Sequence, residues 1–461
     1  MEEKITESHK REGDINISEY RKIWQEKNIS GKTQKILDDD SKYFIHQSLS
    51  TPCLNVVKNV NGIYIEDADG RKYMDFHGNS LHQLGYNNED IVRNVKKQME
   101  ELSFSPRRYT NETAVKLAEK LCTLMGEKEY KTLFTTSGAA SISIALKLAR
   151  KYTGNYKTIS LWDSFHGATL DAVSIGGESV FRKNAGPLMP GTEHIMPYNS
   201  YRCMFGNCRE CRLKCLDYLE YIIEREGDIS AVIMETVRST DIQIPPVEYH
   251  KRLREICSRH NVVMILDEIP TALGRTGEMF AFQNYGIEPD ILVIGKGLGG
   301  GLIPMSAVIA DKKMDICQDS AVGHFTHEKN PLGSAAALAL IEKIEKDGIL
   351  DYVRKISRFF HEKLSELYAK YKEVGDIRVI GLMGAIELVK NRNTKEKAAE
   401  LAEKIMYRCL DKGLSFKVSQ GNVLTLMPPL IITEEELSYA VKLIDEALNE
   451  ELMQQPVHSQ K

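Results

Sequence analysis

Two residues that can support cofactor chemistry each stand at the end of an apolar run. Asp267 ends the run VVMILD, and Lys296 follows the run ILVIG after an interval that suits one strand, helix and strand crossover. A lysine amine can form an imine with a carbonyl cofactor, and desolvation between the neighbouring glycines would lower its pKa. A nearby carboxylate can keep a pyridine nitrogen protonated, which makes the ring an electron sink. Taken singly, Asp267 is more simply a helix cap and Lys296 an exposed loop lysine.

A small-residue turn and an aromatic residue follow two other apolar runs. Ser137, Gly138 and Ala139 end the region around TLFTT and lead directly into a helical pattern. Backbone N–H groups at such a helix start favour a phosphate, although an ordinary helix cap has the same appearance. Phe165 and His166 come shortly after TISLW, where an aromatic ring either stacks on a flat cofactor or belongs to the core. Because ligands of open parallel sheets bind beyond the carboxyl ends of the strands, these residues are candidates for one site.

Gly295, Gly297 and Gly300 also match the GxGxxG fingerprint of dinucleotide-binding proteins. A true fingerprint opens a helix, and an acidic residue ends a second strand about 20 residues further on. Here the glycines lead into Pro304 and another apolar run, and no such acidic residue follows. The sequence therefore argues against a nicotinamide-dependent oxidoreductase.

Short apolar runs alternate with helical patterns from about Lys131 to Ala310. Runs that are apolar throughout suit strands buried on both faces of a largely parallel sheet with helices packed over it. This part of the chain is therefore predicted to be an α/β core.

After Asp347 the pattern becomes mostly helical. Amphipathic runs cover 351–371 and 395–412, and Thr433 with Glu436 predicts a capping box at the start of a last helix. The runs VIGLMGAIELV and VLTLMPPLII are strand candidates, which makes this lobe α+β. Near the other end of the chain, the Asp-Gly turn in NGIYIEDADGRKYMDF predicts two short strands that join the same lobe.

The composition describes an ordinary globular protein. The chain has 461 residues, of which 42% are hydrophobic and 27% charged, and its net charge is -4. That balance argues against nucleic acid or an acidic membrane surface as the main partner and favours small molecules. The charged first residues lack the apolar core of a signal peptide, and no apolar stretch approaches the length of a membrane span. We therefore expect a soluble cytoplasmic protein.

Four of the nine cysteines crowd into one short segment: Cys203, Cys208, Cys211 and Cys215. Converging thiolates can hold a structural zinc ion or an iron–sulfur centre, but this spacing does not match the usual paired CxxC patterns well. Reduced free thiols in a loop are the simpler interpretation, so no metal ligand is assigned.

In this order, these segments resemble the class III (ω-type) aminotransferases from about Ile63 to Leu452. The resemblance implies a pyridoxal 5'-phosphate (PLP)-dependent transferase of fold type I. It has a large domain with a mostly parallel seven-stranded sheet and a small α+β domain built from both chain ends. We expect an N-terminal arm at 1–40, small-domain parts at 41–86 and 346–452, the PLP-binding domain at 87–345 and a tail at 453–461.

The resemblance also implies roles for single residues. Lys296 would be the catalytic Schiff-base lysine, and Thr326 would reach the cofactor phosphate of a neighbouring subunit, which makes a homodimer with shared active sites obligatory. The other residues implied to bind the cofactor are Ser137, Gly138 and Ala139 at the phosphate, and Phe165, His166, Glu235 and Asp267 around the ring.

Several family positions differ in this chain. The acidic motif on the phosphate-site helix is replaced by 140–143 (Ala-Ser-Ile-Ser), the usual glutamine near the phenolic oxygen is Pro270, and the small residues before Asn330 are 327–329 (His-Glu-Lys). Many family members have an arginine for the substrate carboxylate where this chain has Thr425, so that route of carboxylate capture is lost. The cations that could hold a different anion are Lys329, Lys417, Arg238, Arg107 and Arg108.

Segments such as HQSLSTPCL and THEKNPLG resemble a subgroup of ammonia-lyases that act on aminophosphonates. The reaction expected from this resemblance removes ammonia from a hydroxylated 2-aminoethylphosphonate and releases phosphonoacetaldehyde. The alternative is a transaminase that moves the amino group of an ω-amine or amino acid to a keto acid. A non-catalytic ligand-binding relative is a further alternative, against which the retention of Lys296 and Asp267 speaks.

Overall fold

The computed structural model describes residues 18–206 and 211–453. The chain divides into two compact units. The first contains Met1–Gly78, Thr240–Ile242 and Lys355–Lys461, and the second contains Asn79–Ser239 and Gln243–Arg354.

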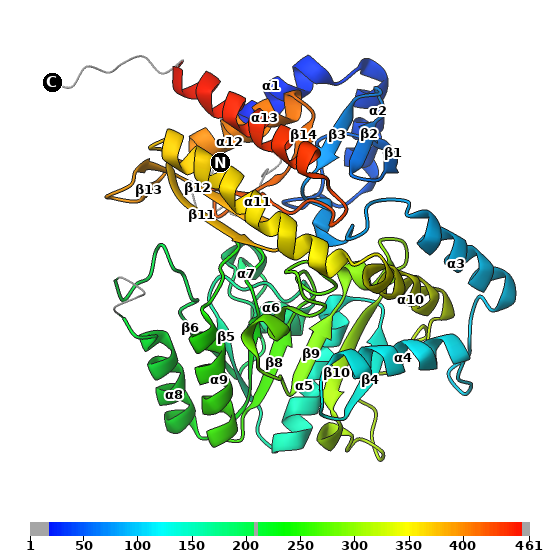
Figure 1. Ribbon diagram of the computed structural model, residues 1–461. Helices are drawn as coiled ribbons and strands as arrows, with labels where there is room; N and C mark the ends of the chain where they lie inside the picture. Colours follow the sequence, from blue (N-terminus) through cyan, green and yellow to red (C-terminus); the bar gives the residue numbers. More distant parts are fainter. Residues whose placement is uncertain (1–17, 207–210, 454–461) are drawn as a thin grey trace. The chain divides into compact units, whose positions relative to one another are not determined.

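The second unit is built on a seven-stranded sheet (Figure 1). Strands β9, β8, β7, β5 and β6 run parallel to one another, whereas β10 lies antiparallel between β4 and β9. The strands in sheet order are β4 (Tyr130–Thr135), β10 (Ser306–Asp311), β9 (Ile291–Ile294), β8 (Val263–Asp267), β7 (Ile229–Glu235), β5 (Lys157–Leu161) and β6 (Thr192–Ile195). Every residue of β7, β8 and β9 is buried, so the prediction of a mostly parallel sheet with strands covered on both faces is confirmed.

Helices cover this sheet, and their apolar residues complete the core. On α5, the buried residues Ile142, Ala145 and Ala149 pack into one cluster with Ile233 of β7 and Ile265 of β8. The helices of the second unit are α3 (Glu89–Glu101), α4 (Glu112–Leu124), α5 (Gly138–Thr153), α6 (Leu170–Ile175), α7 (Ser179–Arg182), α8 (Lys214–Glu226), α9 (Val247–Arg259) and α10 (Pro331–Lys346). Short 3-10 turns are η2 (Gly78–Ser80), η3 (Ala281–Tyr285), η4 (Lys296–Gly299) and η5 (Lys312–Met314).

The first unit joins both ends of the chain in one sheet. Strand β14 (Leu414–Ser415) pairs in parallel with β3 (Lys72–Asp75), with Leu414 opposite Met74. On its other side β3 pairs antiparallel with β2 (Tyr64–Asp67), which in turn pairs antiparallel with β1 (Val57–Asn61). The predicted α+β domain made from both chain ends is thereby confirmed, as are the two short strands around the Asp-Gly turn.

A second sheet of this unit corrects one strand prediction. The run VIGLMGAIELV is not a single strand, because it turns at Gly381 (φ 56°) and splits between two antiparallel strands. The sheet order is β11 (Val374–Ile380), β12 (Met383–Asn391), β16 (Val423–Leu426) and β15 (Lys417–Ser419), and β13 (Glu396–Lys397) pairs with β12. Strand β16 takes only the start of VLTLMPPLII, since proline lacks the N–H that a central strand needs.

Five helices complete the first unit: α1 (Glu19–Asn28), α2 (Gly31–Tyr43), α11 (Ile349–Lys370, which begins in the second unit), α12 (Ala399–Asp411) and α13 (Glu434–Met453). The predicted capping box at the start of α13 is present. The Glu436 N–H donates to Thr433 Oγ1 at 3.1 Å, and the Thr433 N–H donates to Glu436 Oε2 at 2.9 Å.

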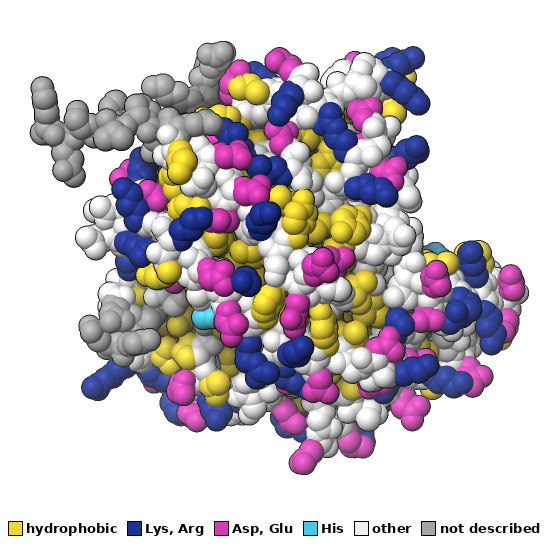
Figure 2. All heavy atoms as spheres, turned by 45° about the horizontal axis from the view of Figure 1, so that its top comes forward, with side chains coloured by type: hydrophobic (Ala, Val, Ile, Leu, Met, Phe, Trp, Pro, Cys, Tyr) yellow, Lys and Arg dark blue, Asp and Glu magenta, His cyan; other side chains and the backbone are white. Residues whose placement is uncertain are grey.

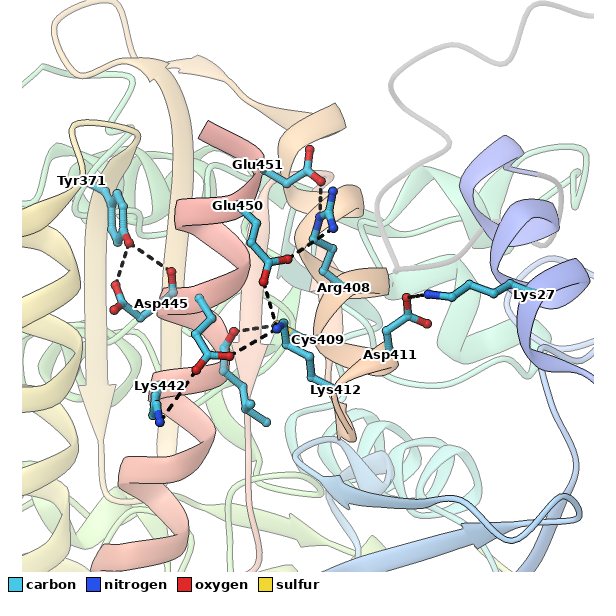
Figure 3. A network of polar contacts seen from close by, with 12 residues as sticks. Lys27, Tyr371, Arg408, Cys409, Asp411, Lys412, Lys442, Asp445, Glu450 and Glu451 are labelled. Carbon is cyan, nitrogen blue, oxygen red and sulfur yellow. Dashed lines mark hydrogen bonds and ion pairs between the residues drawn. The ribbon is translucent and has the colours of Figure 1, made fainter. Parts of the chain in front are cut away.

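Ion pairs join α12 to α13 (Figure 3). Arg408 binds Glu451 and Glu450, and Lys412 lies 2.9 Å from Glu450 Oε1. These side chains are only partly exposed, and each cation meets more than one carboxylate, so they form a network rather than isolated surface pairs.

Lysine and arginine side chains are interspersed with acidic ones on the face shown in Figure 2. No helix among residues 18–206 and 211–453 is both long and apolar enough to cross a bilayer.

Candidate active site

Two buried carboxylates end neighbouring strands of the seven-stranded sheet. Glu235 ends β7 and Asp267 ends β8, and the two residues are register partners in this parallel pair. Their exposed fractions are 5% and 1%. On the other side, Asp267 is the register partner of Val293 in β9, and Lys296 begins the turn η4 just after that strand. The structure therefore gathers Glu235, Asp267 and Lys296 at the carboxyl edge of three adjacent strands.

Asp267 is held by two hydrogen bonds. Its Oδ2 lies 2.7 Å from Nδ1 of His166, and its Oδ1 accepts the N–H of Ile269 at 3.0 Å. His166 is almost fully buried, and its other ring nitrogen, Nε2, has no hydrogen-bond partner among the described residues. The sequence pointed to an aromatic at this position but not to a link between His166 and Asp267.

Glu235 lies in surroundings that favour its neutral form. Burial raises the pKa of its carboxyl, and the neighbouring Asp267 raises it further. Oε2 accepts hydrogen bonds from the backbone N–H of Ser239 at 2.9 Å and from its hydroxyl at 3.1 Å. Oε1 is buried without a partner among the described residues, so Glu235 can offer an O–H group there.

The turn from β4 leads directly into the start of α5. Ser137 caps α5, with its hydroxyl accepting the Ala140 N–H at 3.2 Å, and the Ser137 side chain is exposed. A Cβ at Gly138 would come within 2.6 Å of Ile269 Cδ1, and a Cβ at Gly167 (φ 129°) would come within 2.6 Å of Ala139 Cβ. Both positions therefore require glycine, because Ile269 and Ala139 pack closely against them. The first backbone N–H groups of α5 lack acceptors within the helix and can serve an anion.

Lys296 departs from one expectation. The glycines beside it were expected to desolvate its amine, but the Lys296 side chain is exposed in the single chain, because glycines have no side-chain atoms to cover it. Its backbone adopts a left-handed conformation, with φ 45°.

Gln83 is a buried residue beside this turn that the sequence did not single out. Its Oε1 would lie only 1.9 Å from a Cβ at Gly297.

Phe165 and Thr326 are both accessible. Phe165 is 38% exposed and packs against Phe181, with 4.4 Å between the ring centroids. Thr326 is exposed in the segment between η5 and α10, whose first turn is capped by Asn330.

Two further polar residues, Ser141 and Glu268, hydrogen-bond segments near the site, and the sequence did not indicate a role for them. Ser141, on α5, hydrogen-bonds Thr135 Oγ1 at 2.8 Å and Ser306 Oγ at 2.9 Å. Glu268 is fully buried, and burial raises its pKa to about 7. Glu268 accepts hydrogen bonds from the Thr236 hydroxyl and from the backbone N–H groups of 281 and 282, so it ties the segment after β8 to β7.

The candidate anion-binding cations have different environments. Arg107, Arg108 and Lys329 are exposed, Lys417 is half-buried, and Arg238 is buried. Thr425 is buried in the first unit, where its hydroxyl donates to the Thr240 carbonyl at 3.1 Å.

Comparisons with known proteins give one family and several relatives that match nearly the whole chain. The model of the family described as "Aminotransferase class-III" matches residues 45–448. The chain is 50% identical over 452 residues to the (R)-1-hydroxy-2-aminoethylphosphonate ammonia-lyase of Vibrio splendidus, covering 95% of this chain and 94% of that protein. It is 35% identical to a leucine/methionine racemase of Thermococcus litoralis, covering 90% and 96%. A solved structure of taurine:2-oxoglutarate aminotransferase from Bifidobacterium kashiwanohense, in complex with PLP and glutamate, is 28% identical with a TM-score of 0.86, covering 92% of this chain and 99% of that one.

Proposed function

The chain belongs to the class-III aminotransferase family of PLP-dependent enzymes, and on that premise we propose that it eliminates ammonia from a hydroxylated 2-aminoethylphosphonate. The observation that carries this proposal is the 50% identity, over nearly the whole chain, to an ammonia-lyase named for (R)-1-hydroxy-2-aminoethylphosphonate. Thr425 supports it, because a hydroxyl bonded to the Thr240 carbonyl offers no cation to a substrate carboxylate.

The residues around the carboxyl edge of the sheet suit the three functional groups of PLP. The helix start at Ser137, Gly138 and Ala139 suits the phosphate, since the first backbone N–H groups of a helix lack acceptors within it. The Asp267 carboxylate, oriented by His166, suits the pyridine nitrogen. The Lys296 amine suits the aldehyde.

Within this proposal each residue has a distinct task. The bound cofactor supplies an electron sink for the carbon that carries the substrate nitrogen. With the cofactor bound, Lys296 would be the base that takes the proton from that carbon and could return it. Phe165 and His166 would pack against the ring, and Glu235 would donate or accept a hydrogen bond beside it.

The overall reaction balances without an added oxidant or reductant. The C–H bond beside the substrate nitrogen and the C–O bond on the next carbon break, and water leaves. Water then cleaves the C–N bond, which yields ammonia and phosphonoacetaldehyde.

We further propose a cytoplasmic homodimer in which the exposed Thr326 serves the phosphate site of the partner subunit.

A second candidate, transamination, is favoured by the 34% identity to an acetylornithine aminotransferase of Caldanaerobacter subterraneus. The two reactions are separated by incubating the holoenzyme with (R)-1-hydroxy-2-aminoethylphosphonate alone. Sustained release of ammonia and phosphonoacetaldehyde, in equal amounts and without any keto acid, is the expected result. A single turnover that leaves the cofactor in its amine form, with no free ammonia, would overturn the lyase and favour the transaminase.

A further inference from the structure

The cysteine segment that the sequence singled out supplies no further site among the described residues. Cys203 and Cys211 lie before α8, Cys215 lies in its first turn, and Cys208 is outside the described residues. The three described cysteines are free thiols. Their sulfur atoms do not form one of the groups of three ligand atoms that lie within 4.8 Å of one another, so they do not converge on one ion.

Three buried hydroxyl groups of the second unit form a chain at the carboxyl edge of the seven-stranded sheet. Thr135 ends β4, and Ser306 begins β10 and lies opposite Thr135 in this antiparallel pair. Ser141 belongs to α5. The exposed fraction is 2% for Thr135 and 0% for both serines. Each of these hydroxyls therefore needs a hydrogen-bond partner within the protein.

The chain of hydroxyls joins two backbone carbonyl groups. The Thr135 hydroxyl donates to the Ser137 carbonyl at 2.8 Å, and Thr135 Oγ1 lies 2.8 Å from Ser141 Oγ. Ser141 Oγ lies 2.9 Å from Ser306 Oγ, and the Ser306 hydroxyl donates to the Ile294 carbonyl. A continuous polar path thus runs from the N-cap of α5 to the last residue of β9.

Both ends of this path belong to the proposed cofactor site. Ser137 begins the phosphate turn (137–139), and Ile294 directly precedes the lysine turn (295–299), which carries Lys296. Ser306 also packs against the lysine turn, because a Cβ at Gly295 would lie 3.1 Å from Ser306 Oγ. The hydroxyl chain therefore touches the two segments to which the cofactor's phosphate and aldehyde are assigned.

The number of hydrogens makes Ser141 the separable link. A carbonyl group can only accept, so the hydroxyl hydrogens of Thr135 and Ser306 are both used at the ends of the chain. The Ser141 hydrogen alone remains for the two inner contacts. Ser141→Ala therefore opens the chain in its middle while both carbonyls keep their donors, so no buried carbonyl loses its hydrogen bond.

We propose that Thr135, Ser141 and Ser306 are positioning residues, whose hydroxyl chain holds the phosphate turn and the lysine turn at the separation that PLP requires. The phosphate arm and the aldehyde of PLP leave neighbouring carbons of one flat ring, so the two turns must match a fixed spacing. A displacement of about 1 Å at such a site can cost about 10²-fold in rate. This inference rests on the assignment of Ser137 and Lys296 in the proposed function, and it holds for a lyase and a transaminase alike.

The test compares wild-type holoenzyme with Ser141→Ala and Ser306→Ala. PLP should leave each variant about 2- to 10-fold faster during dialysis, which is the change expected for one hydrogen bond. Amide hydrogen exchange of Ser141→Ala, read by mass spectrometry, should increase in both turns although they are far apart in the sequence. The pH midpoint of the bound cofactor's visible absorbance should also shift, because the Lys296 amine is displaced relative to the ring.

Ser230→Ala is the matched control. Ser230 is 0% exposed near the start of β7, at the opposite edge of the sheet, and its hydroxyl donates to the Lys157 carbonyl at 2.7 Å. The substitution removes the same atom, so it should affect stability but not PLP release or the absorbance midpoint. The double variant Ser141→Ala/Ser306→Ala should release PLP no faster than the faster single variant, because a chain that is already open cannot be opened again.

The outcomes separate this inference from the site assignment. Borohydride reduction of the wild type, followed by peptide mass mapping, locates the residue that binds PLP covalently. PLP on Lys296 with wild-type release, exchange and absorbance midpoint in Ser141→Ala would overturn the positioning role alone, as would equal changes in Ser230→Ala. PLP bound elsewhere would overturn the assignment and this inference together. Thr135→Val breaks the first link with nearly unchanged shape and decides the same question if Ser141→Ala does not fold.

Discussion

His166 and Asp267 lie 101 residues apart in the chain, yet their side chains meet at 2.7 Å in a buried pair. The histidine follows β5 and the aspartate ends β8, so the pair spans the carboxyl edge of the sheet across the intervening β7. Because Asp267 is 1% exposed, the partner that orients its carboxylate should matter for both stability and cofactor binding.

His166→Phe should keep a ring in place but leave Oδ2 of Asp267 without its donor. We expect a loss of about 1–3 kcal/mol in the free energy of unfolding and weaker PLP binding. Denaturant unfolding and titration of the cofactor absorbance would measure the two effects. His260→Phe, at a half-buried histidine away from the site, should change neither by a comparable amount.

Lys296→Ala should reduce turnover by at least about 10²-fold, because the proposed proton carrier is lost. The fold should tolerate the change, since the Lys296 side chain is exposed. Steady-state ammonia release and the thermal unfolding temperature would test both statements. Lys97→Ala, at a lysine whose side chain is 72% exposed on α3, is the control and should keep full activity. Full activity in Lys296→Ala would contradict the assignment.

Gly297→Ala should disturb the turn that carries Lys296, because the new Cβ would meet the buried Gln83 at 1.9 Å. Overpacking of this kind commonly destabilises by about 1–3 kcal/mol. The double variant Gln83→Ala/Gly297→Ala removes the obstructing amide and should recover much of the stability and cofactor absorbance. No recovery would mean that Gly297 is required for another reason.

Glu268→Gln should change how stability depends on pH. The folded-state pKa of Glu268 is raised from 4.5 to about 7, so between these values the folded chain binds the proton more strongly than the unfolded chain. Its contribution to stability is therefore fully present below pH 4.5 and is lost as the pH rises through 7, by about 3 kcal/mol at most. The difference in unfolding free energy between wild type and Glu268→Gln, measured from pH 5 to 8, should show this fall in the wild type. A flat difference would contradict it.

Arg378→Met should leave Glu387 as a buried charge without its cation. The two side chains lie 2.9 Å apart, and Arg378 also donates to the carbonyls of 241 and 242. We expect a loss of about 3–5 kcal/mol in unfolding free energy. Replacing Glu387 by Leu as well should restore a substantial part, and the two measurements together form a double-mutant test.

The strand ends could be predicted from sequence because fully buried parallel strands are continuous apolar runs. Asp267 and Lys296 follow such runs, and the structure has both at the expected edge of the sheet. The pairing of His166 with Asp267 could not be predicted, since a hydrogen bond between residues so far apart leaves no local pattern. The exposure of Lys296 could not be predicted either, because it depends on which side chains of other segments fold over it. Gly381 shows the limit of apolar patterning, because a tight hairpin between two apolar strands has the same pattern as a single run.

The parallel pairing of β14 with β3 also bears on synthesis. While the ribosome is still making the chain, β3 is complete long before Leu414, its partner for Met74, has been added. That side of the N-terminal sheet consequently stays open through most of translation, as a bare edge that can recruit a strand from another nascent chain. A product that stops before residue 414 should keep this open edge and aggregate, even though its larger sheet has all seven strands.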